Sequence, residues 1–331
     1  MTNPSQSNPH TPTTPNAPHS PASPSPAQPL QAERGRATGD LPLKEHILMV
    51  NDVSRGEKYL EAMKAKIKPG DIVLEVGTGA GLLACLAAKL GAKHVYTVEQ
   101  SPELFRVACK TVEQNGLADK VTLINANSRE LKDSGVIKQP IDVFVTETIG
   151  TQGLDEGILN IFADVKPLLA PNARIIPETV QFKHCLVNMS GIREQLEVMN
   201  PILGVDLSSL NAELQSNNHF WMHPIEMWRE LSTTAGTPIF DLLDFESQES
   251  IQTMQITRDN VCDGLLNWSE FSLSHSNTIE TRYRHFGNSW ANSIYFMDRC
   301  FVTRAQTCTA TMRVNDDRLG WVLNWTIKTP E

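Results

Sequence analysis

Two glutamates near the middle of the chain have the residue type and spacing to bind a cation. Glu147 and Glu156 lie nine residues apart in a stretch, 146–157, that contains three glycines. Two carboxylates that face each other across such a loop repel unless a cation lies between them. A guanidinium meets that need, because its planar N–H donors form paired hydrogen bonds with carboxylates. The pattern favours a site for a guanidinium. On residue type alone, the alternative is that both glutamates are solvated charges on a surface loop.

A glycine-rich segment indicates a second binding site. Glu75-Val-Gly77-Thr-Gly79-Ala-Gly81 separates an apolar run from the helix formers that begin at Leu82. Glycines let the backbone turn sharply and approach a ligand at a helix N-terminus. The third glycine of a dinucleotide motif would fall at Leu82, so the spacing fits S-adenosylmethionine better. Glu99 is placed to accept hydrogen bonds from two ribose hydroxyls, and a tight turn with a surface glutamate is the alternative.

The elements that would position these residues alternate between strands and helices. Strands are expected over 72–76, 95–99, 121–125 and 141–146, and helices over 50–66, 82–90, 102–115 and 157–169. Strands that are nearly continuous in apolar residues indicate a parallel sheet covered on both faces. Right-handed crossovers would make residues 41–177 a doubly wound α/β domain.

The pattern changes after Pro177. Strands are expected over 179–189, 261–274, 293–297, 307–314 and 321–328, with helical segments over 192–199 and 224–231. Most of these strands have no helix of adequate length between them, which indicates antiparallel pairing. Residues 178–331 are therefore predicted to form a β-rich second domain, with an insertion at about 190–230. Trp268, Trp321 and Trp325 are expected in its core.

The first 40 residues differ in composition from the rest. Nine of the 20 prolines lie between Pro4 and Pro29, and the first acidic or basic side chain is Glu33. Such a segment has little apolar surface to offset the entropy of ordering, so residues 1–40 are predicted to be a disordered tail. A linker or a partner-docking segment is the alternative.

Composition limits the function classes. The 331 residues allow two domains, and a net charge of −9 argues mildly against a nucleic-acid partner. No apolar run reaches the ~20 residues of a membrane helix, and no secretory signal is visible. The six cysteines form no CxxC pair, which indicates reduced thiols and a cytoplasmic location.

Several motifs together resemble the protein arginine methyltransferases over residues 46–328. They are Met49-Val-Asn-Asp52-Val-Ser-Arg55, the glycine loop with Glu99, the double-glutamate loop, Leu169-Ala-Pro-Asn-Ala-Arg-Ile-Ile-Pro177, and Gly287-Asn-Ser-Trp290 in place of the family's Thr-His-Trp. Gly204-Val-Asp-Leu-Ser and the Thr-Glu-Thr-Ile-Gly-Thr loop look closest to the branch with the monomethylating and tandem-domain members. The resemblance implies a Rossmann-like class I methyltransferase domain, then an antiparallel β-barrel-like domain with an inserted helical arm.

The resemblance also implies an activity and roles for residues. The activity would be S-adenosylmethionine-dependent N-methylation of an arginine guanidinium in a protein, a peptide or free arginine. Glu147 and Glu156 would be catalytic, with Glu156 taking the released proton, and Arg55 would grip the cofactor carboxylate. Cofactor-binding residues would be His46, Met49, Arg55, Glu75, Gly77, Gly79, Gly81, Leu82, Glu99, Gln100, Ser128 and Glu147, and substrate-binding residues Asp52, Ile149, Ser289 and Trp290.

Departures from the family pattern bear on the acceptor. Ser289 replaces the histidine that would pair with Asp52, and Arg129 stands where many members hold a carboxylate for the adenine amine. The Tyr-Phe pair before the first helix is missing, with His46 the only comparable residue. Ile149 replaces Met or Phe, and its stiff β-branched side chain should crowd the site and favour monomethylation. Methylation of another small-molecule amine, or a non-catalytic scaffold, are the alternatives.

Partners and metals complete the expectations. The resemblance implies that the insertion is an arm that docks on the cofactor domain of a second subunit and gives a head-to-tail homodimer. The apolar residues of the insertion agree with such docking, and packing on the chain's own barrel is the alternative. These residues are Ile192, Leu196, Met199, Phe220, Trp221, Met227 and Trp228. His219 and His223 have the spacing of a helical metal pair, but no third ligand is identifiable, so no metal site is expected.

Overall fold

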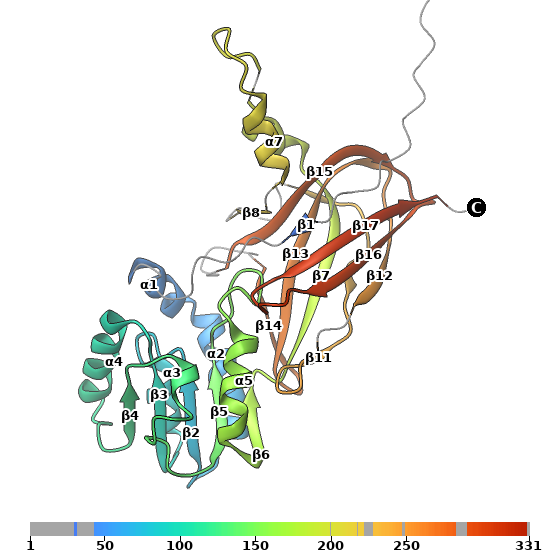
Figure 1. The fold of residues 1–331 in the computed structure, drawn as a ribbon. Helices are drawn as coiled ribbons and strands as arrows, with labels where there is room; N and C mark the ends of the chain where they lie inside the picture. Colours follow the sequence, from blue (N-terminus) through green and yellow to red (C-terminus); the bar gives the residue numbers. More distant parts are fainter. Residues whose placement is uncertain are drawn as a thin grey trace, which may run out of the picture.

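The computed structural model describes residues 30–31, 43–198, 200–216, 218–221, 228–246, 249–282 and 290–329. In these residues a parallel sheet with its helices is followed along the chain by a larger antiparallel region (Figure 1). No helix in the described part is long and apolar enough to cross a membrane. Within the expected tail, Leu30–Gln31 forms the short strand β1, which pairs with β17 (Trp321–Lys328), and the rest lies outside the described residues.

The parallel sheet has the strand order β4-β3-β2-β5-β6. Its strands are β2 (Ile72–Val76), β3 (His94–Val98), β4 (Val121–Ile124), β5 (Ile141–Thr146) and β6 (Leu169–Ile176). All five residues of β2 are buried, as a central strand covered on both faces requires. The chain runs from β2 outward to β4 and then returns to β5 beside β2. This reversal of direction lies between β2 and β5, where such sheets bind ligands.

The helices of this region agree with the expected ones except at two places. They are α1 (Leu43–Asn51), α2 (Val53–Lys66), α3 (Leu82–Lys89), α4 (Pro102–Gln114) and α5 (Ile158–Val165), with short 3-10 turns η1 (Ser128–Glu130) and η2 (Lys166–Leu168). The expected helix 50–66 begins instead at Val53 as α2, because Asp52 leaves the helical conformation and caps it, and α1 lies almost entirely before the expected range. No strand is expected over 169–177, yet this segment contains β6, which pairs in parallel with β5.

The antiparallel region consists of two sheets that share one core. One has the order β10-β7-β13-β15-β8 and the other β1-β17-β16-β12. The long strands are β7 (Thr179–Asn188), β12 (Ser250–Gln255), β13 (Asn260–Ser274), β15 (Asn292–Val302) and β16 (Thr307–Val314). Trp321 is 2% exposed and Trp268 5%, as expected, whereas Trp325 is only partly buried against the core.

Short strands complete these sheets. They are β8 (Asn218–Trp221), β9 (Arg229–Glu230), β10 (Ala235–Gly236), β11 (Phe240–Asp241) and β14 (Asn277–Glu280). The expected helix over 224–231 is wrong where the chain is described, because β9 pairs with β7 there. Backbone pairing with an available sheet edge prevails over the local helical pattern.

The insertion leaves the antiparallel region as an arm that carries α6 (Ser190–Leu196) and α7 (Ser208–Ser216). Figure 1 shows α7 projecting away from the parallel sheet. Ile192, Leu196 and Trp228 pack on the chain's own sheet, so for these three residues the packing alternative is correct. Met199 and Met227 lie outside the described residues, as do the side chains of Phe220 and Trp221. The arm instead exposes another apolar set: Ile202, Leu203, Val205 and Leu210.

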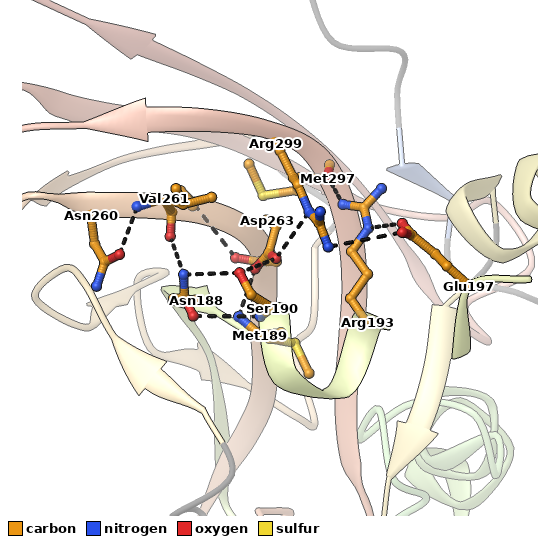
Figure 2. Close-up of polar contacts among 12 residues, drawn as sticks. Asn188, Met189, Ser190, Arg193, Glu197, Asn260, Val261, Asp263, Met297 and Arg299 are labelled. Atoms are coloured by element: carbon orange, nitrogen blue, oxygen red, sulfur yellow. Dashed lines mark hydrogen bonds and ion pairs between the residues drawn. The ribbon is translucent and has the colours of Figure 1, made fainter. Parts of the chain in front are cut away.

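A buried carboxylate holds the root of the arm (Figure 2). Asp263 of β13 is fully buried and accepts hydrogen bonds from the Met189 backbone N–H at 2.6 Å and the Ser190 hydroxyl at 3.1 Å. The Arg299 Nε lies 3.7 Å from Asp263, and the same guanidinium reaches Glu197 at 3.8 Å. These contacts fix the start of α6 to β13 and β15, because a buried carboxylate must be paired.

Candidate active site

A cavity of about 1300 Å³ opens at the carboxyl ends of the parallel strands. The expected site residues that line it are His46, Met49, Asp52, Arg55, Glu75, Gly77, Gly79, Leu82, Glu99, Gln100, Ser128, Glu147, Ile149, Glu156 and Trp290. Gly81 does not line the cavity; it caps α3 with a φ of 91°, a conformation that favours glycine. Ser289 lies outside the described residues.

Glu99 directly follows β3, and two backbone donors fix its carboxylate. The Gly79 N–H donates to Oε2 at 2.9 Å, and the Ser101 N–H donates to Oε1 at 2.8 Å. A Cβ on Gly77, whose φ is 85°, would lie 2.6 Å from the Thr148 methyl. Glycine at position 77 therefore allows the glycine loop and the loop after β5 to approach closely, and the two N–H donors hold Glu99 at the cavity wall.

Glu75, at the end of β2, is a buried carboxyl beside this loop. It is 1% exposed, and the Thr97 hydroxyl donates to its Oε2 at 2.5 Å. Burial raises the pKa of Glu75 to about 8, although the hydrogen bond from Thr97 acts in the opposite direction. At neutral pH this carboxyl is therefore mostly protonated, and it adds little negative charge beside Glu99.

The start of α2 brings a cation into the cavity. Asp52 accepts a hydrogen bond from the Arg55 backbone N–H at 3.1 Å and so begins the helix one turn before that side chain. The Arg55 guanidinium donates to Glu147 Oε1 at 3.0 Å and to the Met49 carbonyl at 2.7 Å. It also lies 5.2 Å from the centre of the Trp290 ring. Arg55 is therefore held in place from the strand, the helix and the antiparallel region.

The two glutamates of the loop after β5 share this enclosed space. Burial raises the pKa of Glu147, and the charge of Arg55 opposes the shift. Burial also raises the pKa of Glu156 to about 8, and the nearby Glu147 and Asp155 carboxylates add to the shift. Arg55 thus stabilises one negative charge, and a second cation is needed to ionise both glutamates at neutral pH.

The antiparallel region positions the double-glutamate loop. The Trp290 indole N–H donates to the Ile149 carbonyl at 2.8 Å, and the Ser269 hydroxyl donates to the Gln152 carbonyl at 3.0 Å. Gly153 has a φ of 89°, and a Cβ there would lie 2.7 Å from Ser269 Cβ. The loop is thus fitted against β13 and Trp290, which closes the cavity over the two glutamates.

Residue patterns missed several groups of the cavity wall. Tyr59 is fully buried and donates to the Thr146 carbonyl at 2.9 Å. Asp155, whose pKa burial raises to about 6, accepts from the Gln152 N–H at 3.0 Å and shapes the loop. Asp164 of α5 accepts from the Ser128 hydroxyl at 2.7 Å. Asp155 could have been found from the sequence, because it is an acidic residue directly before Glu156. Asp164 could not, because only the packing of α5 brings it to the cavity.

The cavity fits S-adenosylmethionine. Its size exceeds the roughly 300–1000 Å³ of usual small-molecule sites, so it can hold a cofactor together with an acceptor. The fixed Glu99 carboxylate suits ribose hydroxyls, and the glycine loop leaves the α3 N-terminus open to the ligand. Among the described residues, no group of three or more His, Cys, Asp or Glu could hold a metal ion. His223 lies outside these residues, as does the side chain of His219.

Fold and cavity define an α/β protein with a nucleotide-type site at the strand reversal of a doubly wound sheet. The family model of ribosomal protein L11 methyltransferase (PrmA) matches residues 57–180. The chain is 27% identical over 281 residues to an arginine N(omega)-methyltransferase of Streptomyces achromogenes subsp. streptozoticus, covering 83% of this chain and 75% of the relative. It is 25% identical over 250 residues to mouse protein arginine N-methyltransferase 7, covering 70% of this chain but only 36% of that protein.

A solved structure agrees over both regions of the chain. The Trypanosoma brucei PRMT1 enzyme-prozyme complex with AdoHcy superposes with a TM-score of 0.75 at 19% identity, covering 86% of this chain and 93% of that chain. The resemblance to arginine methyltransferases is thereby confirmed. The fold is confirmed as a Rossmann-like class I methyltransferase domain followed by an antiparallel β-barrel-like domain with a helical arm.

Proposed function

We propose that this chain is an S-adenosylmethionine-dependent N-methyltransferase that acts on an arginine guanidinium. The observation that carries the proposal is the enclosure of Glu147 and Glu156 in the same cavity as Glu99 and the glycine loop. Arg55 balances one of the two glutamates, so an incoming guanidinium would balance the other. Relatives named as arginine N-methyltransferases support the same conclusion.

The two glutamates would orient and activate the acceptor. S-Adenosylmethionine, when bound, supplies an electrophilic methyl group on its sulfonium. Glu147 and Glu156 would hold the guanidinium by charged hydrogen bonds and leave one nitrogen free to attack in line. Glu156 would accept the proton that this nitrogen releases, because burial and the neighbouring Glu147 and Asp155 carboxylates raise its pKa and favour its protonated form.

Two glutamine substitutions test the mechanism. A Glu147→Gln, Glu156→Gln variant should still bind S-adenosylhomocysteine in calorimetry, yet lose methyl transfer to free arginine and to arginine peptides by at least about 10³-fold. Glu113→Gln, on the exposed side of α4, is the matched control. Unchanged turnover of the double variant would refute the mechanism. Mass spectrometry with other amines, in parallel, tests the alternative acceptors.

Monomethylation is the proposed product outcome. Ile149 is 2% exposed, lines the cavity and has its carbonyl fixed by Trp290. A fixed β-branched wall beside the guanidinium leaves little room for a nitrogen that already carries a methyl group.

A homodimer is the proposed assembly, and the cytoplasm the proposed location. At the arm, Leu203 is 99% exposed and Val205 57%, and on α1 Ile47 is 53% and Leu48 55% exposed. Two apolar surfaces so far apart on one chain can cover each other in a second copy, in a head-to-tail ring. Leu203→Asp should lower the mass measured by light scattering from that of a dimer to that of a monomer, while Ile239→Asp, also exposed, should not.

The proposed cytoplasmic location rests on the cysteines. The six free cysteines agree with a reducing compartment.

A further inference from the structure

A serine–aspartate pair forms one end of the cavity. The Ser128 hydroxyl of η1 donates to Asp164 Oδ2 of α5 at 2.7 Å, and both residues line the cavity. Ser128 is 8% exposed and Asp164 is half-buried, so this hydrogen bond is partly shielded from water. A carboxylate has two acceptor oxygens, and the bond from Ser128 orients Asp164 while Oδ1 can accept a hydrogen bond from a ligand.

The sheet order shows which part of a nucleoside ligand would reach this pair. Strands run in the order β4-β3-β2-β5, and Glu147 follows β5 whereas Glu99 follows β3. A ligand with its reactive end at Glu147 and its ribose at Glu99 must extend its base toward the end of β4. Ser128 lies in the turn that follows β4, and α5 packs against this turn.

The surroundings suit a flat heterocycle with a polar edge. Leu104, Ala126 and Ile161 line this part of the cavity and offer apolar contacts to ring faces. Arg129 also lines it and donates from Nε to Asn127 at 3.1 Å. A guanidinium has only donors, so it cannot accept a hydrogen bond from a ring amine. Asp164 is the carboxylate that can do so.

We propose that Asp164, oriented by Ser128, accepts a hydrogen bond from the exocyclic amine of adenine and makes the site select adenine over hypoxanthine. The inference rests on the proposed cofactor. Hypoxanthine carries a carbonyl oxygen in place of the amine, and this oxygen would face the Asp164 carboxylate without a proton between them. A site that forms a hydrogen bond with one ligand binds an analogue weakly when the analogue cannot form that bond.

Calorimetry with two nucleosides tests the proposal. The unaltered protein should bind S-adenosylhomocysteine at least ~10-fold more tightly than S-inosylhomocysteine, since a hydrogen bond to a charged group is at stake. Asp164→Asn should lower the affinity for S-adenosylhomocysteine by ~10-fold. The affinities for the two nucleosides should then agree within about threefold, because the amide can donate to the hypoxanthine oxygen. Asp119→Asn, the same change at an exposed turn, should keep the original preference.

The outcomes separate this inference from the proposed function. Equal affinity of the unaltered protein for both nucleosides, or an unchanged preference in a folded Asp164→Asn variant, overturns the role of Asp164 and leaves the methyltransferase proposal standing. Adenine selectivity without methyl transfer to any guanidinium supports Asp164 and overturns the proposed acceptor. Failure to bind either nucleoside overturns both.

Discussion

The Arg55 guanidinium donates to the Glu147 carboxylate at 3.0 Å, although the two residues are 92 positions apart in the chain. The Arg55 and Glu147 side chains are 9% and 16% exposed, so this pair is largely removed from water. It joins the helix that follows Asp52 to the loop that follows β5. A buried pair of this kind sets the charge state of its surroundings more than it adds net stability.

Arg55→Lys should disrupt the site although it keeps the charge. Lysine has a single side-chain nitrogen, so it cannot donate to Glu147 and to the Met49 carbonyl from two nitrogens as arginine does. It also has no planar group to stack on Trp290. We expect kcat/KM to fall at least ~10-fold, since small misplacements of reacting groups have large effects. Lys64→Arg, on the exposed face of the same helix, is the matched control, and equal loss in both variants would contradict a specific role.

Methyl transfer should increase as the pH rises through the pKa of Glu156. Burial raises the pKa of Glu156 to about 8, so below that pH the free protein holds a proton on the group that must accept one. The value of kcat/KM for the acceptor reports groups of the free enzyme and should rise from pH 6, reach half of its maximum near the pKa of Glu156 and level above about pH 9. Glu156→Gln should remove this rise of kcat/KM with pH, together with most of the activity. A flat profile between pH 6 and 9 would exclude Glu156 as the base.

Ile149→Met should raise the yield of dimethylated product. An unbranched thioether can move away from a methylated nitrogen, whereas a β-branched wall cannot. The measurement is the ratio of dimethylarginine to monomethylarginine at long incubation with excess cofactor. Ile175→Met, which packs against the core in β6 and does not line the cavity, controls for general loosening. Abundant dimethylarginine from the unaltered protein would show that Ile149 does not limit the product.

Gly153→Ala should damage the double-glutamate loop more than a surface glycine change. The added Cβ would clash with the Ser269 hydroxyl, on a backbone with a φ of 89°. We expect a loss of about 2 kcal/mol or more in the free energy of unfolding, together with loss of activity. Gly116→Ala, with a φ of 67° and open space around it, isolates the backbone strain. Equal losses of stability in the Gly153→Ala and Gly116→Ala variants would show that contact with Ser269 adds nothing to the backbone strain.

Asp263→Asn should loosen the root of the arm. The amide would place a donor where the Met189 N–H or the Ser190 hydroxyl now donates, and Arg299 would lose its buried counter-charge. We expect a loss of about 2–4 kcal/mol in the free energy of unfolding. Asp316→Asn, at a side chain 96% exposed, should change stability little. Thermal unfolding measures both, and a near-zero effect at Asp263 would show that the arm root is held by apolar packing alone.

The sequence by itself determined the elements and the two loops that carry the chemistry. The strands 72–76, 141–146, 307–314 and 321–328 coincide with β2, β5, β16 and β17, because apolar runs between turn residues are local signals. The type and spacing of Glu147 and Glu156 predicted a shared site, and both residues line one cavity.

Only the tertiary structure decided which partners these residues meet. The break at Asp52, the strand β6 and the strand β9 depend on sheet edges and capping contacts that local pattern does not encode. The pairs Arg55–Glu147, Ser128–Asp164 and Ser269–Gln152 join elements far apart in the chain. Burial raises the pKa of Glu156 to about 8, and burial is a property of the assembled fold. Local sequence thus set the groups available for chemistry, and long-range packing set their charge, direction and distance.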